Sequence, residues 1–174
     1  MFATFRAIAN GSRALALLSQ SEVILQRREW KRNGKRVVCA VGVFDLLHPG
    51  HIRLLEQARA QGDILVVAIQ SDTHARGKKG AGRPIMPAAE RAEIVAAFES
   101  VDVAVELAEE RLATRFLKEF APDILVEGSS ASSAKSAVNM KNPARAPGIA
   151  VIHIPPEPGH STSRLIERIK QLRA

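Results

Sequence analysis

Two short apolar runs joined by one amphipathic segment constrain the fold of this chain more than any other feature of its sequence. The runs are residues 36–43 and 64–69, and both are rich in β-branched residues, which is typical of buried strands. Between them, apolar residues recur at helical spacing over residues 52–61. A strand, a helix and a strand within about 35 residues predict a right-handed βαβ unit, and therefore a parallel sheet.

The segment that joins the first run to the helix, residues 42–51, carries the residues best suited to bind an anion. Pro49 suits the first turn of a helix because its missing N–H would have no intrahelical partner there. Gly50 lets a ligand approach the backbone closely. His48 and His51 then flank a helix N-terminus, whose free N–H groups and dipole favour negative charge. The segment predicts a phosphate site that contains imidazole groups.

Each histidine taken alone has simpler interpretations. A histidine near a helix start is most often a cap or a surface residue. Two histidines are also metal ligands in many proteins, but a zinc site needs three or four ligands and Cys39 is the only cysteine. We therefore expect no protein-built metal site, and the cap and the phosphate site both stay open as interpretations.

The rest of the chain continues the alternation of strands and helices. This alternation predicts an α/β fold, a Rossmann-like doubly wound parallel sheet of five strands. Residues 73–87 are expected to form a long polar loop at the carboxyl edge of the sheet, and residues 128–148 to be the least regular part. The further expected helices cover residues 13–19, 21–32, 88–99 and 109–120, with a last one after Ser161, and the further strands cover residues 101–105, 124–126 and 149–154.

The positive charge of the chain is concentrated near its start. The formal net charge is +7, and residues 1–36 hold eight of the 25 cations but only two of the 18 anions. The rest of the chain is therefore nearly neutral, and without tyrosine it lacks an aromatic platform for bases, so a nucleic-acid partner is disfavoured. No apolar run approaches the ~20 residues of a membrane span. With a single cysteine in a buried strand, we expect a cytoplasmic protein.

Three further groups of residues offer positive potential or hydrogen-bond donors. Lys78 and Lys79, with Arg83, lie in the glycine-containing polar loop, and a solvated basic loop is their simpler interpretation. Arg91 lies near the start of its helix, where a surface salt bridge to Glu93 is the simpler interpretation. The third group, at the start of the last helix, consists of Ser161, Thr162 and Ser163.

The run from Gly42 to Ala58 as a unit resembles the His-x-Gly-His signature of the cytidylyltransferase-like nucleotidylyltransferase family. The similarity extends over residues 34–169 and is closest to the adenylyltransferase domain of bifunctional ADP-heptose synthases, a domain close to glycerol-3-phosphate cytidylyltransferase. It implies a basic helical extension at residues 1–35 and a nucleotidylyltransferase domain at residues 36–174. The other matching stretches are residues 62–68, 79–84, 90–93, 101–102, 122–126 and 159–163.

This resemblance assigns roles to the candidate residues. It implies that His48 and His51 contact the transition state and that Lys79 contacts phosphate. It implies Mg²⁺ bound with the nucleoside triphosphate (NTP). The residues expected to bind nucleotide are Gly42, Val43, Phe44, Asp45, Gly50, Arg91, Gly128, Ser161, Thr162 and Ser163. The residues expected at the acceptor are Asp72, Lys78 and Arg83.

The sequence departs from the family pattern where the acceptor should bind. The family usually has Val-Lys-Gly-Gly-Asp after the fourth strand, whereas this chain has Glu127 in place of the lysine, followed by Gly128 and two serines. A carboxylate beside phosphates would oppose their binding unless a cation offsets it. The acidic-aromatic run after the third strand is reduced to residues 106–110, and the Gly-Gly before the fifth strand is Pro147-Gly148.

The function expected from these features is transfer of a nucleotidyl group from ATP or CTP to a sugar or polyol phosphate. ATP with D-glycero-β-D-manno-heptose 1-phosphate is the leading pair, and a CTP-dependent enzyme acting on a glycerol-phosphate-like acceptor is the next. A catalytically degenerate nucleotide-binding regulatory module and a basic RNA-binding protein are two competing hypotheses. Dimers are common among similar proteins, so a homodimer is considered beside a monomer.

Overall fold

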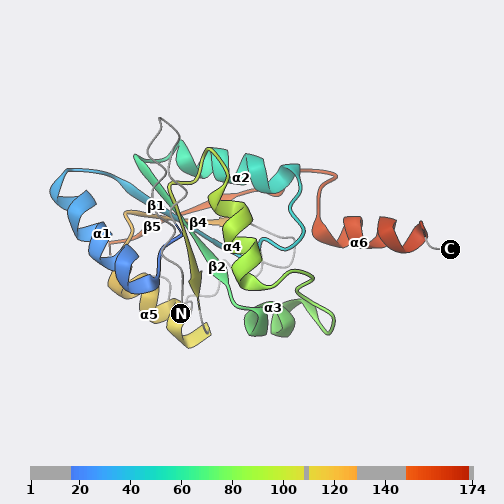
Figure 1. The fold of residues 1–174 in the computed structure, drawn as a ribbon. Coiled ribbons are helices and arrows are strands. Elements are labelled where there is room, and N and C mark those ends of the chain that lie inside the picture. The colour runs from blue at the N-terminus through green and yellow to red at the C-terminus, as the bar shows by residue number, and fades with distance from the viewer. Residues whose placement is uncertain (1–16, 108–109, 129–147, 173–174) are drawn as a thin grey trace, which may run out of the picture.

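The computed structural model describes residues 17–107, 110–128 and 148–172, and it confirms the α/β fold with a five-stranded parallel sheet (Figure 1). The sheet has the order β3-β2-β1-β4-β5. Its strands are β1 (Val37–Gly42), β2 (Ile64–Gln70), β3 (Val103–Leu107), β4 (Ile124–Gly128) and β5 (Ala150–Ile154). The helices are α1 (Gln20–Arg32), α2 (Pro49–Arg59), α3 (Asp72–Lys79), α4 (Ala88–Ala96), α5 (Glu110–Phe120) and α6 (Thr162–Gln171).

The register of the strands brings their carboxyl ends to one edge. Gly42 at the end of β1 pairs with Ile69 of β2, and Gly128 at the end of β4 pairs with Ile154 of β5. β1 lies in the centre of the sheet, and the strand order reverses beside it, between β1 and β4. In open parallel sheets, ligands bind at the carboxyl edge near such a reversal, so the loop after β1 holds the favoured position.

Helices cover both faces of the sheet (Figure 1). On one face, α2 and α4 cover a core that includes Leu55, Val67 and Val126. On the other face, α1 and α5 cover a second core that includes Val23, Phe116 and Phe120. Residues of β1 alternate between these two cores, as the period of two in a strand requires. The single cysteine, Cys39, is fully buried in the second core, which raises the pKa of its thiol to about 12.

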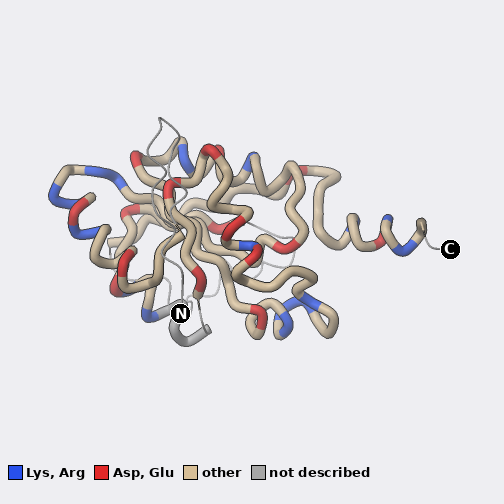
Figure 2. The backbone as a smooth tube through the Cα atoms, viewed as in Figure 1, with Lys and Arg blue, Asp and Glu red and all other residues tan. Residues whose placement is uncertain are grey.

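Helix α1 belongs to the layer that covers the sheet. Its N-cap is Ser19, whose backbone N–H donates to the Glu22 carboxylate while its hydroxyl accepts from the Glu22 N–H. Val23 is fully buried in the second core, and the Arg27 guanidinium donates to the carboxylate of Asp123 at 3.0 Å. The helix predicted for residues 21–32 is therefore confirmed, and it packs on the domain with the cations of its far end exposed (Figure 2).

Two other predictions about regular structure need correction. The loop predicted for residues 73–87 begins instead with α3, because the Ser71 hydroxyl accepts from the His74 N–H and the helix buries Ala75. The helix predicted for residues 13–19 does not reach its expected end, since Leu17 forms a parallel bridge with Ala104 of β3. The start of that predicted helix, and nearly all of the irregular segment predicted at 128–148, lie outside the described residues.

The third strand starts two residues later than predicted and α4 ends three residues earlier. Asp102 sets the start of β3, because its backbone N–H donates to the Leu65 carbonyl and its carboxylate accepts from the Leu65 N–H. The end of α4 tightens into i→i−3 hydrogen bonds from Ala97 and Phe98, so residues 97–99 leave the helix. The fourth and fifth strands and the last two helices lie close to their predicted positions.

Helix α6 differs from the other helices in its packing. It has no buried residue, and it projects from the body of the molecule (Figure 1). Among the helices in the described ranges, none combines the length and the hydrophobicity that a membrane-spanning segment requires.

We expect Val23→Ala to lower the free energy of unfolding by about 1.5–3 kcal/mol, because it removes two methyl groups from a closely packed core and leaves a cavity. The matched control is Leu25→Ala on the same helix, where the side chain is 61% exposed and the loss should stay within about 0.5 kcal/mol. Urea unfolding of the full chain measures both values. Equal effects of the two substitutions would contradict the placement of α1 on the sheet.

Candidate active site

The loop between β1 and α2 has a tightly constrained backbone. Phe44 and Leu46 adopt positive φ angles of 54° and 47°, in the left-handed region that non-glycine residues rarely occupy. The Phe44 side chain turns back into the core beneath the loop. Gly42 makes room for it, because a Cβ at that position would lie 2.8 Å from the Phe44 ring. The loop is therefore shaped by packing on its inner side.

The two histidines predicted to act together lie in contact at the start of α2. His48 is the N-cap residue and His51 is the third residue of the helix. Their rings stack with centroids 3.8 Å apart, and the His48 backbone N–H donates to Nδ1 of His51 at 3.3 Å. Because Nδ1 of His51 accepts this bond, a neutral His51 carries its proton on Nε2. His51 therefore caps the helix with one nitrogen and keeps a donor on the other.

Both imidazoles favour the neutral form. Burial lowers the pKa of His51 to about 4, with a further contribution from His48 and a smaller opposing one from Asp45. Burial also lowers the pKa of His48, and the nearby His160 adds to this effect. Nδ1 of His48 is buried without a hydrogen-bond partner among the described residues. At neutral pH the pair thus acts through hydrogen bonds rather than through a fixed positive charge.

A third imidazole, from the loop before α6, completes the cluster. The His160 ring lies nearly parallel to that of His48, with the centroids 6.5 Å apart. The family resemblance includes His160 in a matching stretch but implies a role only for the three hydroxyl residues that follow it. The sequence does contain an indication that His160 belongs to the site. His160 lies at the end of the β5–α6 loop, which reaches the same edge of the sheet as the β1–α2 loop.

Gly50 and Glu157 hold the β5–α6 loop against α2. A Cβ at Gly50 would lie 3.0 Å from Nδ1 of His48 and 3.3 Å from Cβ of Glu157, so the absence of a side chain permits this approach. Glu157 forms an ion pair with Arg53 of α2. The approach of a ligand stays a prediction for Gly50; in the structure the missing side chain lets the histidine ring and the neighbouring loop pack closely.

The carboxylate of Asp45 fastens the β1–α2 loop to the segment before α4. Asp45 is 2% exposed, and its carboxylate accepts from the backbone N–H groups of Ile85 and Met86 at 3.0–3.1 Å. Arg83 forms an ion pair with the same carboxylate, with Nε 2.9 Å from Oδ2. The side chains of Asp45 and Arg83 are therefore engaged with each other, and this arrangement does not support the direct ligand contacts expected for them.

Arg91 is also placed differently from the prediction. Its side chain is fully buried, and its guanidinium donates to the carbonyls of Val43, Met86 and Gln70 and to the Asp72 carboxylate. The nucleotide contact expected for Arg91 and the acceptor contact expected for Asp72 have no support here, because the two groups pair with each other. A surface salt bridge between Arg91 and Glu93 is wrong for the same reason. Arg91 acts as a positioning residue for the loop.

The three hydroxyl residues at the start of α6 lie in three different environments. The Ser161 hydroxyl caps the helix by accepting from the Arg164 N–H at 3.2 Å. The Thr162 hydroxyl donates to the carbonyl of Asp45 at 2.7 Å, which connects α6 to the histidine loop, residues 43–48 between β1 and α2. Ser163 is exposed. The start of α6 thus lies beside the loop that leads into α2, and two of the three hydroxyls are engaged by protein groups.

The remaining candidate residues lie around this centre. Lys78 and Lys79 are exposed at the end of α3, and cations gather at this end of the molecule (Figure 2). Gly128 ends β4, and a Cβ there would lie 3.2 Å from Leu54 of α2.

Glu127, the departure from the family pattern, lies on the other face of the sheet from the cluster of His48, His51 and His160. Its carboxylate is 3.7 Å from the His153 ring. Glu127 pairs in register with Val41, which packs on the core of the α1 and α5 face. Because residues that pair in register point to the same face, this carboxylate lies on the face of the sheet away from α2.

The described residues include no group of three or more His, Cys, Asp or Glu side chains placed to hold a metal ion. The carboxylate that interacts with His51, that of Asp45, is occupied by amides and Arg83. The described side chains therefore offer Mg²⁺ few ligands of their own. They fit an ion that is held chiefly by phosphate oxygens and water, which is how Mg²⁺ is commonly bound at nucleotide sites.

Comparison with known proteins points to one family. Residues 39–168 match the family model described as cytidylyltransferase-like. The chain is 43% identical over 152 residues to the bifunctional protein HldE of Koribacter versatilis, and 35% identical over 153 residues to that of Rhodopseudomonas palustris (strain BisB5). These matches cover 87% and 88% of this chain but 31% of each relative, so the chain spans about a third of their length.

A solved structure agrees with these matches. The crystal structure of the lipopolysaccharide core biosynthesis protein from Thermoplasma volcanium GSS1 is similar with a TM-score of 0.53 and 30% sequence identity. The match covers 71% of this chain and 98% of that protein.

The lowered pKa of His51 predicts a pH-dependent stability. As the pH falls below 6.5, the unfolded chain binds a proton at this residue before the folded chain does, so the free energy of unfolding decreases until about pH 4. The expected loss is on the order of 2–3 kcal/mol between pH 7 and pH 4. His51→Gln removes the titrating group but keeps an acceptor for the His48 N–H.

Denaturant unfolding of wild type and His51→Gln across this pH range measures the difference, because the other titrating groups contribute to both proteins. The stability of the variant should fall less steeply below pH 6.5. Parallel pH curves for the two proteins would contradict the burial of His51.

Proposed function

Because the chain belongs to the cytidylyltransferase-like family, we propose that it is a nucleotidylyltransferase that uses an NTP and a phosphorylated sugar or polyol. In this reaction an oxygen of the acceptor phosphate attacks the α-phosphorus of the NTP. The bond from the α-phosphorus to the bridging oxygen breaks, and pyrophosphate leaves. The observation that carries the proposal is the stacked pair His48 and His51 at the start of α2, opposite the start of α6.

The arrangement supports this reaction through hydrogen bonding. Phosphoryl transfer needs little covalent help from the protein, and catalysis comes from positioning and from stabilising charge on the phosphate oxygens. Nε2–H of neutral His51 is a donor already oriented by the bond at Nδ1. The helix starts of α2 and α6 add backbone N–H groups and favourable dipoles. His160, at 6.5 Å from His48, is a third imidazole for the phosphates.

Positive charge must then come from elsewhere, because the histidines favour the neutral form. In the proposal, Mg²⁺ bound to the triphosphate supplies part of it by neutralising charge on the phosphate oxygens. Lys79 supplies another part from the end of α3, with Lys78 beside it; Gly80, at φ 94°, is the C-cap of that helix. The Ser163 hydroxyl is exposed and free to meet the nucleotide.

ATP with D-glycero-β-D-manno-heptose 1-phosphate is the favoured substrate pair. Its support is the identity of 43% to a bifunctional HldE protein over most of this chain. CTP with a glycerol-phosphate-like acceptor is the second candidate, supported by the cytidylyltransferase-like family match. A regulatory module without catalysis would be favoured by a carboxylate that opposes phosphate binding, and Glu127 is the candidate for such a group. Glu127 lies beside His153 on the face away from α2, and this position weakens the case for a regulatory module.

Pyrophosphate release tests the proposed substrates. The purified chain is incubated with Mg²⁺ and either ATP or CTP, with heptose 1-phosphate, glycerol 3-phosphate or no acceptor, and pyrophosphate is measured by a coupled assay. We expect release that requires an acceptor, fastest with ATP and the heptose phosphate. Release only with CTP and glycerol 3-phosphate would favour the second candidate. NTP binding with no release for any acceptor would contradict the enzymatic proposal.

We expect His51→Ala to lower the turnover number by about 100–1000-fold, which is the usual cost of losing a preorganised donor to a transition-state oxyanion. The matched control is His153→Ala, because His153 lies on the other face of the sheet beside Glu127 and should leave turnover within about twofold. Circular dichroism of both variants checks that the fold is retained. Full turnover in folded His51→Ala would remove His51 from the mechanism.

A further inference from the structure

Helix α6 forms a projecting amphipathic arm. It has ten residues, and none of them is buried. On a helical projection Leu165, Ile166, Ile169 and Leu172 share one side. Ile169 is 50% exposed and Leu172 is 80% exposed, although both belong to this apolar side. The apolar side of an amphipathic helix is usually packed against another surface, so the arm needs a partner.

The charges on the arm have a defined place. Arg168 and Lys170 lie on either side of the apolar residues in the same projection, while Glu167 lies on the opposite side. The arm as a whole carries three cations and one anion. Its apolar side is therefore bordered by positive charge along both edges.

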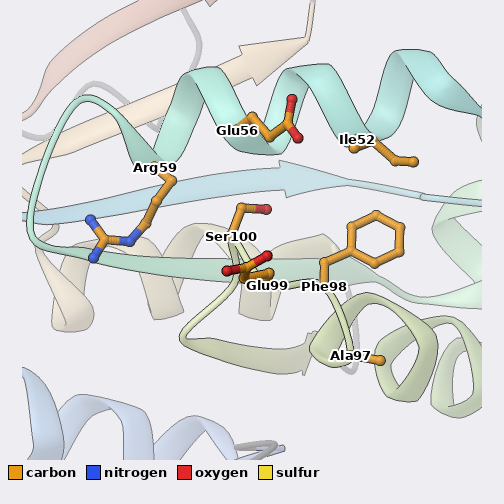
Figure 3. A pocket seen from close by; sticks show the side chains of 7 residues that line it. All are labelled: Ile52, Glu56, Arg59, Ala97, Phe98, Glu99 and Ser100. Atoms are coloured by element: carbon orange, nitrogen blue, oxygen red, sulfur yellow. The ribbon is translucent and has the colours of Figure 1, made fainter. Parts of the chain in front are cut away.

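The same chain carries an apolar groove of complementary charge. A cavity of about 500 Å³ lies between α2 and the end of α4 (Figure 3), and it is lined by Ile52, Glu56, Arg59, Ala97, Phe98, Glu99 and Ser100. Ile52 is 43% exposed and Phe98 is partly buried, so the groove offers apolar surface. None of the three clustered histidines lines this cavity, which belongs to the flank of the α2 and α4 layer.

The rims of this groove are acidic. Glu56 lies on α2 and Glu99 follows α4, so one carboxylate stands on each side (Figure 3). The cation that lines the groove, Arg59, forms an ion pair with Asp102, its Nε lying 3.2 Å from the Asp102 carboxylate. Within the described ranges neither Glu56 nor Glu99 has an ion-pair partner. The rims thus match the two cationic edges of the arm.

We propose that the arm of one copy of this chain lies in the groove of a second copy, with the exchange made reciprocally about a two-fold axis. The arm does not fill its own groove, since no α6 residue lines the cavity. The Thr162 hydroxyl holds the start of α6 at Asp45, and from there the helix leads away from the body (Figure 1). In the exchanged dimer Ile169 meets Ile52 and Phe98, and the arm cations meet Glu56 and Glu99.

Reciprocal exchange gives the contact enough area to be stable. One three-turn helix alone covers less surface than the ~800 Å² per partner of a standard protein interface. Two-fold symmetry provides the same contact twice, once for each arm, and adds the surfaces between the two bodies. The interface then has apolar centres with charged borders, which is the usual anatomy of a specific interface.

The state of assembly tests the apolar part of the proposal. Sedimentation velocity of the full chain over a range of concentrations should show a dimer. Ile169→Asp on the arm and Ile52→Asp in the groove should each raise the dissociation constant at least about tenfold, because each places a charge at the centre of the contact. Leu25→Asp is the matched control, since Leu25 is 61% exposed on α1 and should leave the dimer unchanged.

Charge reversal tests the geometry itself. One protein carries Arg168→Glu with Lys170→Glu, and the other carries Glu56→Lys with Glu99→Lys. Each alone should be largely monomeric, because arm and rim then have the same sign. Mixed in equal amounts they should form a heterodimer, since both arm–groove contacts again join opposite charges. A monomeric wild type, a dimer insensitive to these changes, or a mixture that stays monomeric would each overturn the proposal.

Discussion

The buried guanidinium of Arg91 is the interaction on which the arrangement of the site depends. The residue is 1% exposed, and it joins the end of β1, the end of β2, the segment before α4 and the start of α3 through three carbonyls and the Asp72 carboxylate. A buried charge is tolerated only when its hydrogen bonds are satisfied, so these four segments must keep their mutual positions. Val43, at the end of β1, is also the first residue of the histidine loop, so the hydrogen bond from Arg91 fixes the position of the loop backbone at its start.

A second polar group extends this fixation towards the C-terminal part of the chain. The Asp45 carboxylate holds residues 85 and 86, and the Asp45 carbonyl receives the Thr162 hydroxyl. Segments that lie more than a hundred residues apart thus meet at one residue of the loop. The three imidazoles come together for this reason, since His48 and His51 follow Asp45 on one side and His160 precedes Thr162 on the other.

Much of the fold could be predicted from local patterns, and the parts that could not depend on distant contacts. The strands were recognisable because β-branched apolar runs have few other structures to adopt, and α1 because its apolar residues lie on one side. The capping box of Ser19 and Glu22, which sets the start of α1, was not part of that prediction. Helix α3 escaped prediction because it has only one buried residue, Ala75, and its polar composition resembles that of a loop. The histidine pair could be predicted as a unit, but the burial of Arg91 could not. Its partners are scattered along the sequence, and nothing local distinguishes a buried arginine from an exposed one. Glu127 could have been placed better, since alternation along β4 assigns it to the face away from α2.

The left-handed conformations of Phe44 and Leu46 have a thermodynamic consequence for ligand binding. Each such residue costs about 1–2 kcal/mol, and the protein meets this cost when it folds. In the proposed reaction, the triphosphate would therefore meet a loop that is already ordered, and little of its binding free energy would be lost in ordering the loop. The entropy cost of ordering this loop belongs to the folding reaction, so a ligand would bind more tightly here than to a flexible loop with the same side chains.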